Sequence, residues 1–129
     1  ARTDVYLRGL VPAEDRVAET LKRAALYQAA GADGLFAAGV SAEYEIAALC
    51  QGTTLPVNVL GLPGLPSLEA LKTLGVRRLS AGSGIAEFLY GATAGLAKSF
   101  LESGKLDSSH LKAFTYGEVN ALLKTSANA

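Results

Sequence analysis

The sequence has 129 residues, of which 50% are apolar, and carries 12 Lys and Arg side chains against 12 Asp and Glu. This length fits one domain. Because the two charge signs are interleaved and cancel, no clustered basic surface is expected, which argues against a nucleic-acid or anionic-membrane partner. The single Cys excludes an internal disulfide and a Cys-based zinc site, and it favours a reducing, cytoplasmic location.

The N-terminal residues predict an incomplete first element. No apolar run reaches the length of about 18 residues that a membrane span needs, and the start lacks the apolar region of a signal peptide. Residues 2–7 follow the pattern of a strand that is ending, without the apolar residues that normally precede such an end. We therefore expect the sequence to begin inside a strand.

The first half of the chain alternates helical and strand patterns. Residues 12–30 predict a helix, because Pro12 and two acidic residues suit its first turn and apolar residues recur at helical spacing. Gly31 supplies the expected C-terminal cap. Residues 34–38 predict a short buried strand, and Ser41 is the expected N-cap of a helix that continues to Leu49.

The same alternation continues in the second half. The expected elements are a strand over 55–60, a turn-rich stretch, a helix over 67–74, a strand over 76–80, a long helix over 85–102 and a last helix over 108–123. Gly104 marks the turn between the two last helices. Alternation of this kind predicts an α/β fold with a parallel sheet.

The number of predicted βα units is too small for a complete barrel. The pattern gives four βα units and a terminal helix, whereas a (β/α)8 TIM barrel needs roughly 250 residues. We therefore interpret residues 1–129 as a single partial domain, the C-terminal half of such a barrel, with residues 105–129 as its terminal helix and tail.

Four short segments in order carry a family resemblance. They are Ala1-Arg2-Thr3-Asp4, the run from Ala29 to Phe36, Pro56-Val57-Asn58-Val59, and the run from Gly75 to Gly82, followed by Tyr116-Gly117-Glu118-Val119-Asn120-Ala121-Leu122 near the end. The series resembles the isocitrate lyase and phosphoenolpyruvate phosphonomutase superfamily, in particular its smaller phosphonomutase-like members. It matches only the second half of such a protein.

The resemblance implies a Mg2+-dependent enzyme that makes or breaks a C–C or P–C bond in a 2-oxo acid or enolpyruvate, with the metal stabilising an enolate-like intermediate. It implies a catalytic and substrate-binding role for Arg2, whose guanidinium suits a carboxylate, and a substrate contact for Asn58. A homo-oligomer is also expected. The family's acidic metal ligands and gating loop belong to the first half, so no metal ligand is expected in this chain, and the isolated chain is expected to be inactive.

The residues after Phe36 depart from the lyase pattern. Lyase members carry Pro-Glu there, whereas this sequence has Ala37-Ala38-Gly39. The missing Glu argues against cleavage of isocitrate or methylisocitrate and favours a phosphonomutase-like or decarboxylase-like activity.

Other polar residues have alternative interpretations. Ser80 to Gly84 could bind a phosphate or simply form a tight turn. Asp4 could orient Arg2 or lie at the rim, and Arg77 and Arg78 are expected to form salt bridges on the face away from the site. His110 is expected to be structural or solvated, and Cys50 a buried, unreactive thiol.

Two non-enzymatic functions stay open beside the enzyme fragment. One is a half-barrel interaction module that pairs with another copy and so covers its exposed sheet edges. The other is a small α/β domain that binds a phosphorylated ligand at residues 80–84.

Overall fold

The computed structural model describes residues 1–107 and 113–125. Contacts between residues divide the chain into two compact units, Ala1–Gly82 and Ser83–Ala129, which are described separately. The interpretation of the chain as one partial domain stays a prediction.

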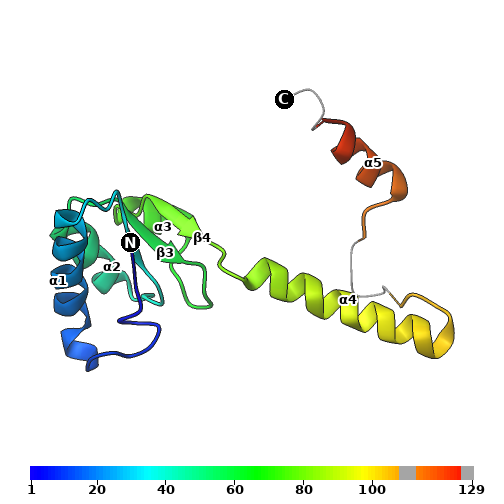
Figure 1. The fold of residues 1–129 in the computed structure, drawn as a ribbon, viewed down its shortest axis with the longest axis horizontal. Helices are drawn as coiled ribbons and strands as arrows, with labels where there is room; N and C mark the ends of the chain where they lie inside the picture. The colour runs from blue at the N-terminus through cyan, green and yellow to red at the C-terminus, as the bar shows by residue number, and fades with distance from the viewer. Residues whose placement is uncertain (108–112, 126–129) are drawn as a thin grey trace. The chain divides into compact units, whose positions relative to one another are not determined.

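The first unit is a parallel α/β layer. Its elements are β1 (Arg2–Thr3), a 3-10 turn (Ala13–Asp15), α1 (Arg16–Ala29), β2 (Leu35–Ala37), α2 (Glu43–Gly52), β3 (Val57–Leu60), α3 (Leu68–Thr73) and β4 (Arg78–Ser80). The four strands pair in parallel in the order β1-β2-β3-β4 (Figure 1). The expected parallel α/β sheet is confirmed.

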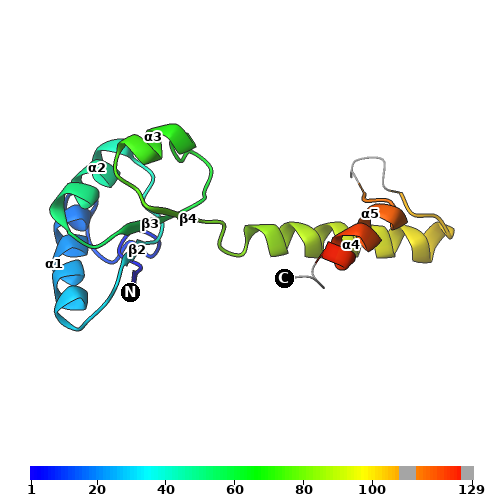
Figure 2. The ribbon, with the colours of Figure 1, turned by 90° about the horizontal axis from the view of Figure 1, so that it is seen from above.

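The helices of this unit lie on one side of the sheet, as Figures 1 and 2 show together. Alternate strand residues face them, because successive side chains of a strand point to opposite faces. The core side chains of the strands are Thr3, Leu35, Ala37, Val57 and Val59, and those of the helices include Ala24, Ile46, Leu49 and Leu71. The opposite face of the sheet carries the remaining strand side chains.

The first strand is shorter than the sequence predicted. Residues 2–7 were expected to end a strand, but β1 stops at Thr3 and turns follow. The backbone N–H of Arg8 donates to the carbonyl of Asp4 at 2.9 Å, and that of Leu10 donates to Val5 at 3.1 Å. Val5 is fully buried, so the turn carries an apolar side chain into the core instead of continuing the sheet.

Two serines near predicted helix starts have different roles. Ser67, the first residue of the predicted helix over 67–74, is the N-cap of α3, because its hydroxyl accepts a hydrogen bond from the backbone N–H of Ala70 at 3.2 Å. Ser41 was expected to cap α2, but this was wrong: Ala42 occupies the N-cap position and no side chain accepts there. The helix starts two residues after Ser41, which places its hydroxyl outside the capping position.

We expect Ser67→Ala to lower the free energy of unfolding by about 1 kcal/mol, because the substitution removes a capping acceptor. Ser41→Ala is the matched control and should change the unfolding free energy by less than about 0.5 kcal/mol. Urea unfolding of the two variants measures both values. Equal losses in the two variants would contradict the assignment of the caps.

Tyr6 makes the stability of the first unit fall at alkaline pH. Burial, and to a smaller extent the nearby Glu45 carboxylate, raise the pKa of Tyr6 well above its ordinary value of 10.0. The folded state therefore holds the phenolic proton more tightly than the unfolded state does. This contribution to stability is fully present below pH 10.0 and is lost as the pH rises above it.

We expect the unfolding free energy of the wild type to fall more steeply above pH 10 than that of Tyr6→Phe, which has no proton to lose. Urea titrations of both proteins from neutral to strongly alkaline pH test this. If the two proteins lose stability in parallel, the buried phenol does not cause the alkaline fall.

The second unit contains α4 (Gly84–Ser103) and α5 (Tyr116–Thr125). The long helix expected over 85–102 is confirmed, and Gly104 ends it in a left-handed conformation with φ of 69°. The last helix was expected from residue 108, but residues 113–115 are not helical, and residues 108–112, with His110, lie outside the described residues. Within the described part of the chain, no helix is long and apolar enough to cross a membrane.

Candidate functional site

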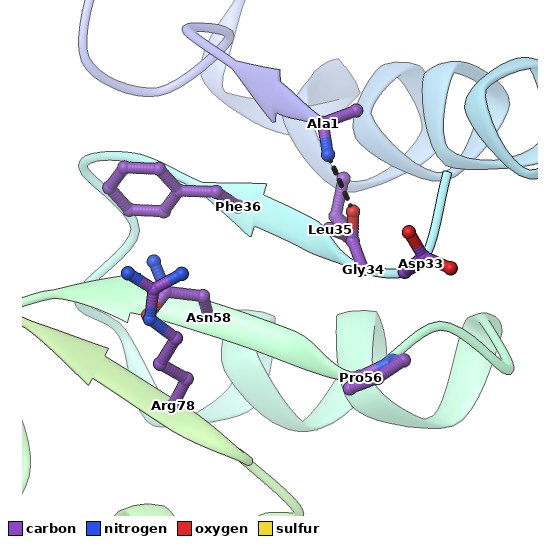
Figure 3. A pocket seen from close by; sticks show the side chains of 8 residues that line it. All are labelled: Ala1, Asp33, Gly34, Leu35, Phe36, Pro56, Asn58 and Arg78. Carbon is purple, nitrogen blue, oxygen red and sulfur yellow. Dashed lines mark hydrogen bonds between the residues drawn. The ribbon is translucent and has the colours of Figure 1, made fainter. Parts of the chain in front are cut away.

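A row of side chains crosses the sheet on the face opposite the helices. The strand register pairs Arg2 with Phe36, Phe36 with Asn58, and Asn58 with Arg78. Residues paired in neighbouring parallel strands project to the same face. Figure 3 shows Phe36, Asn58 and Arg78 on one side of the three adjacent strands. The sheet thus brings together both predicted site residues, Arg2 and Asn58, with one residue between them.

The Arg2 guanidinium is held by two neighbours. Its Nε donates to Oδ1 of Asp4 at 2.7 Å, and its central carbon lies 5.7 Å from the centre of the Phe36 ring. Of the two interpretations of Asp4, the structure shows the one in which it orients Arg2. In the described part of the chain, Asp4 engages only Nε. The two terminal nitrogens therefore remain able to bind a carboxylate in a bidentate way.

Asn58 is a buried polar residue that has one side-chain partner among residues 1–107 and 113–125. It is only 6% exposed, and its amide contacts the hydroxyl of Ser80 at both heteroatoms. Asn58 Nδ2 donates to Ser80 Oγ at 2.9 Å, and Ser80 Oγ donates to Asn58 Oδ1 at 3.1 Å. A buried amide that keeps unused donors and acceptors can bind a ligand through them.

A cavity of about 370 Å³ adjoins this row. Its lining residues are Ala1, Asp33, Gly34, Leu35, Phe36, Pro56, Asn58 and Arg78 (Figure 3). The volume is at the lower end of the range for small-molecule sites. At one side of the cavity the nitrogen of Ala1 donates to the carbonyl of Gly34 at 2.7 Å.

Arg77 and Arg78 were expected to form salt bridges on the face away from the site, and where they lie relative to the site stays a prediction. The strand register places Arg78 on the same face of the sheet as Asn58. Arg78 lines the same cavity as Asn58, and within residues 1–107 and 113–125 neither Arg77 nor Arg78 forms an ion pair. The sequence held the signal for this: Leu79 is the apolar residue of the strand, so alternation places Arg78 and Ser80 together on the opposite face. Ser80 was expected at the end of the strand over 76–80, in a segment that could bind a phosphate or simply form a tight turn.

The other candidate site residues from the sequence, Cys50 and the segment 80–84, show no sign of a reactive thiol or a phosphate site. Cys50 is partly buried, and burial raises the pKa of its thiol, which disfavours a reactive thiolate. Residues 80–84 span the boundary between the two units. In the second unit, Ser83 Oγ donates to the Glu87 carboxylate at 2.6 Å. A negative charge in the first turn of α4 disfavours a phosphate there.

The acidic residues do not form a metal centre in the described part of the chain. Residues 1–107 and 113–125 contain no group of three or more His, Cys, Asp or Glu side chains that could hold a metal ion. The side chains of this face instead offer guanidinium, amide and hydroxyl groups, which suit an anion rather than a cation.

Comparison with known proteins gives solved structures of the same fold. A candidate lyase/mutase from Burkholderia cenocepacia J2315 aligns with a TM-score of 0.78 and 32% identity, over 96% of this chain and 44% of that one. A candidate phosphonomutase from the same organism aligns with a TM-score of 0.70 and 39% identity, over 77% and 40%. The phosphoenolpyruvate phosphomutase of Streptomyces platensis subsp. rosaceus shares the fold at 19% identity and a TM-score of 0.65.

Among curated sequences, an uncharacterized protein of Mycobacterium tuberculosis is 44% identical over 64 residues, which cover 50% of this chain and 24% of that protein. The chain thus spans less than half the length of the relatives it matches. The predicted fold class, an α/β chain that forms part of a phosphonomutase barrel, is confirmed. The family model described as phosphoenolpyruvate phosphomutase matches residues 1–101, and the chain belongs to this family, within the isocitrate lyase and phosphoenolpyruvate mutase superfamily.

Proposed function

We propose that these residues form the substrate-anion side of a phosphonomutase-like or lyase-type enzyme that acts on a 2-oxo acid or enolpyruvate at a C–C or P–C bond. The observation that carries the proposal is the row of Arg2, Asn58 and Arg78 on one face of the sheet. Two guanidinium groups, one of them paired with Asp4 through Nε, favour a small anionic ligand.

In this proposal Arg2 binds the carboxylate through its terminal nitrogens while Asp4 fixes Nε. The Asn58 amide donates to a ligand oxygen and adds no charge. The aromatic ring of Phe36 lies between them in the register and limits the access of water to the row. These groups bind and orient a substrate, and the described residues contain no group of three or more His, Cys, Asp or Glu side chains that could hold a metal ion.

Members of this family are generally metal-dependent. Mg2+ stays part of the proposal, with its ligands outside this chain. The proposal also keeps a cytoplasmic location and the expectation that the isolated chain is inactive. Ala37 and Ala38 are both fully buried where lyase members carry Pro-Glu, so the proposed activity is phosphonomutase-like or decarboxylase-like.

Titration of the chain with oxalate, a planar dianion that resembles an enolate of a 2-oxo acid, tests the proposed ligand class. We expect saturable shifts in the backbone amide signals of residues 2, 36, 58 and 78 in NMR spectra. Oxamide is the matched control, because it has the same shape without charge. Equal shifts with oxalate and oxamide, or none with oxalate, would contradict an anion site.

Activity needs a separate assay on an enzyme that carries both halves of the barrel. With Mg2+ present, we expect turnover of oxaloacetate or phosphonopyruvate, and none by residues 1–129 alone. Activity of these 129 residues by themselves would refute the proposal that catalysis needs both halves of the barrel.

The exposed apolar side chains of α4 favour one second candidate, self-association. Ile85, Phe88, Leu89 and Leu101 are all exposed, and α4 has no buried residue. Exposed apolar patches of this kind mark contact surfaces. Light scattering that gives the mass of a monomer at all concentrations would remove the homo-oligomer and the interaction module from consideration.

A further inference from the structure

The hydroxyl of Ser80 is the side-chain partner of the buried Asn58 amide. Ser80 is the last residue of β4, and Asn58 lies on the neighbouring strand β3. The register pairs Asn58 with Arg78, so Ser80 lies two residues further along β4 on the same face. This diagonal position brings Oγ within 2.9 Å of Nδ2 and 3.1 Å of Oδ1 of Asn58.

The backbone of Ser80 is itself fixed. The N–H of Gly61 donates to the Ser80 carbonyl at 2.8 Å, and a Cβ on Gly61 would lie 3.4 Å from that oxygen. Gly82, with φ of 58°, lets the chain leave β4 close to Leu60, whose Cδ1 lies only 2.8 Å from where a Cβ would be. Close approach on both sides holds the backbone of Ser80 in place.

An asparagine amide without a partner rotates easily, because its terminal torsion has a broad, roughly two-fold energy profile. A single hydroxyl that contacts both amide heteroatoms sets the plane of that amide. The amide has two N–H donors and an oxygen with two lone pairs. Ser80 uses one N–H and one lone pair, which leaves one donor and one acceptor in a fixed plane for a ligand.

We propose that Ser80 is a positioning residue for ligand recognition: it fixes the Asn58 amide so that the remaining N–H faces the anion bound by Arg2. This inference rests on the proposed function, since it assigns Asn58 to the ligand. Ser80 acts through Asn58 and does not itself contact the ligand.

The test compares the oxalate affinity of four forms of the chain by NMR titration. We expect Ser80→Ala to weaken binding about five- to tenfold, the loss expected when one hydrogen bond is no longer well placed. Ser80→Thr keeps the hydroxyl and should restore affinity to within about twofold. Ser99→Ala, on α4, is the control: among the described residues the Ser99 side chain bonds within the second unit, and the variant should bind like the wild type.

A second measurement needs no variant. The heteronuclear NOE of the Asn58 side-chain amide in the wild-type protein should match the values of the rigid backbone, because Ser80 holds the amide plane. A low value, typical of a freely rotating side chain, would overturn the proposal even if Ser80→Ala failed to fold.

The outcomes separate this inference from the function on which it rests. If the wild type binds oxalate and Ser80→Ala binds it equally well, the positioning role is wrong and the proposed function stands. If the wild type binds no oxalate while the Asn58 amide is rigid, the proposed ligand class fails and the positioning role fails with it.

Discussion

We expect the Arg2→Lys substitution to lower kcat/KM by about two orders of magnitude in an enzyme that carries both halves of the barrel. This corresponds to about 3 kcal/mol, the upper range for hydrogen bonds to a charged group. Lysine keeps the charge but cannot bind a carboxylate through two parallel N–H donors. It also cannot donate to Asp4 through Nε while presenting two further nitrogens to a ligand.

Arg8→Lys is the matched control. Arg8 is exposed in the turn that follows β1 and makes no ion pair in the described part of the chain. Its substitution should leave kcat/KM unchanged, and steady-state kinetics with oxaloacetate and phosphonopyruvate measures both variants. Unchanged kinetics for Arg2→Lys would refute its role as the carboxylate-binding residue.

The second large effect is expected at Gly39, just after β2. Gly39 has φ of 96°, and a Cβ there would lie 2.7 Å from the backbone nitrogen of Leu7 and 2.8 Å from its Cα. Both neighbours are backbone atoms, which cannot move aside as a side-chain tip can. We expect Gly39→Ala to lower the unfolding free energy by about 2 to 5 kcal/mol, through backbone strain and overpacking together.

Gly64→Ala separates those two causes. Gly64 has φ of 83°, but nothing lies within 4 Å of an added Cβ, so only the conformational cost of about 1 to 2 kcal/mol applies. Urea unfolding of the two variants gives the difference. Similar losses of unfolding free energy in the two variants would show that the close contact with the Leu7 backbone adds nothing to the cost of a side chain at residue 39.

Local sequence signals predicted the elements of the first unit well. Apolar runs bounded by Gly and Pro marked the strands β2, β3 and β4, and Ser67 marked the start of α3. The errors fell where tertiary contacts outweigh local preference. The chain after Thr3 turns because Val5 enters the core, and α2 begins without the cap that Ser41 appeared to offer.

The candidate site was predictable only in part. The family resemblance suggested Arg2 and Asn58, whose roles stay proposals, and the register places both on one face of the sheet. Arg78 and Ser80 were not assigned to that face, although the alternation around Leu79 would have placed both there. The contact of Ser80 with Asn58 spans 22 residues of sequence, so no local pattern could reveal it.

The sequence by itself determined the alternation of strands and helices, the parallel α/β class, the family, and the restriction to part of a barrel, because these depend on apolar periodicity and on motif order. Only the tertiary structure decided which side chains meet on the open face of the sheet. A shift of one residue in strand pairing moves every side chain to the other face. The bond between Asn58 and Ser80, the position of Arg78 and the close approach of Gly39 to Leu7 all depend on that register, which is set by packing between strands far apart in the chain.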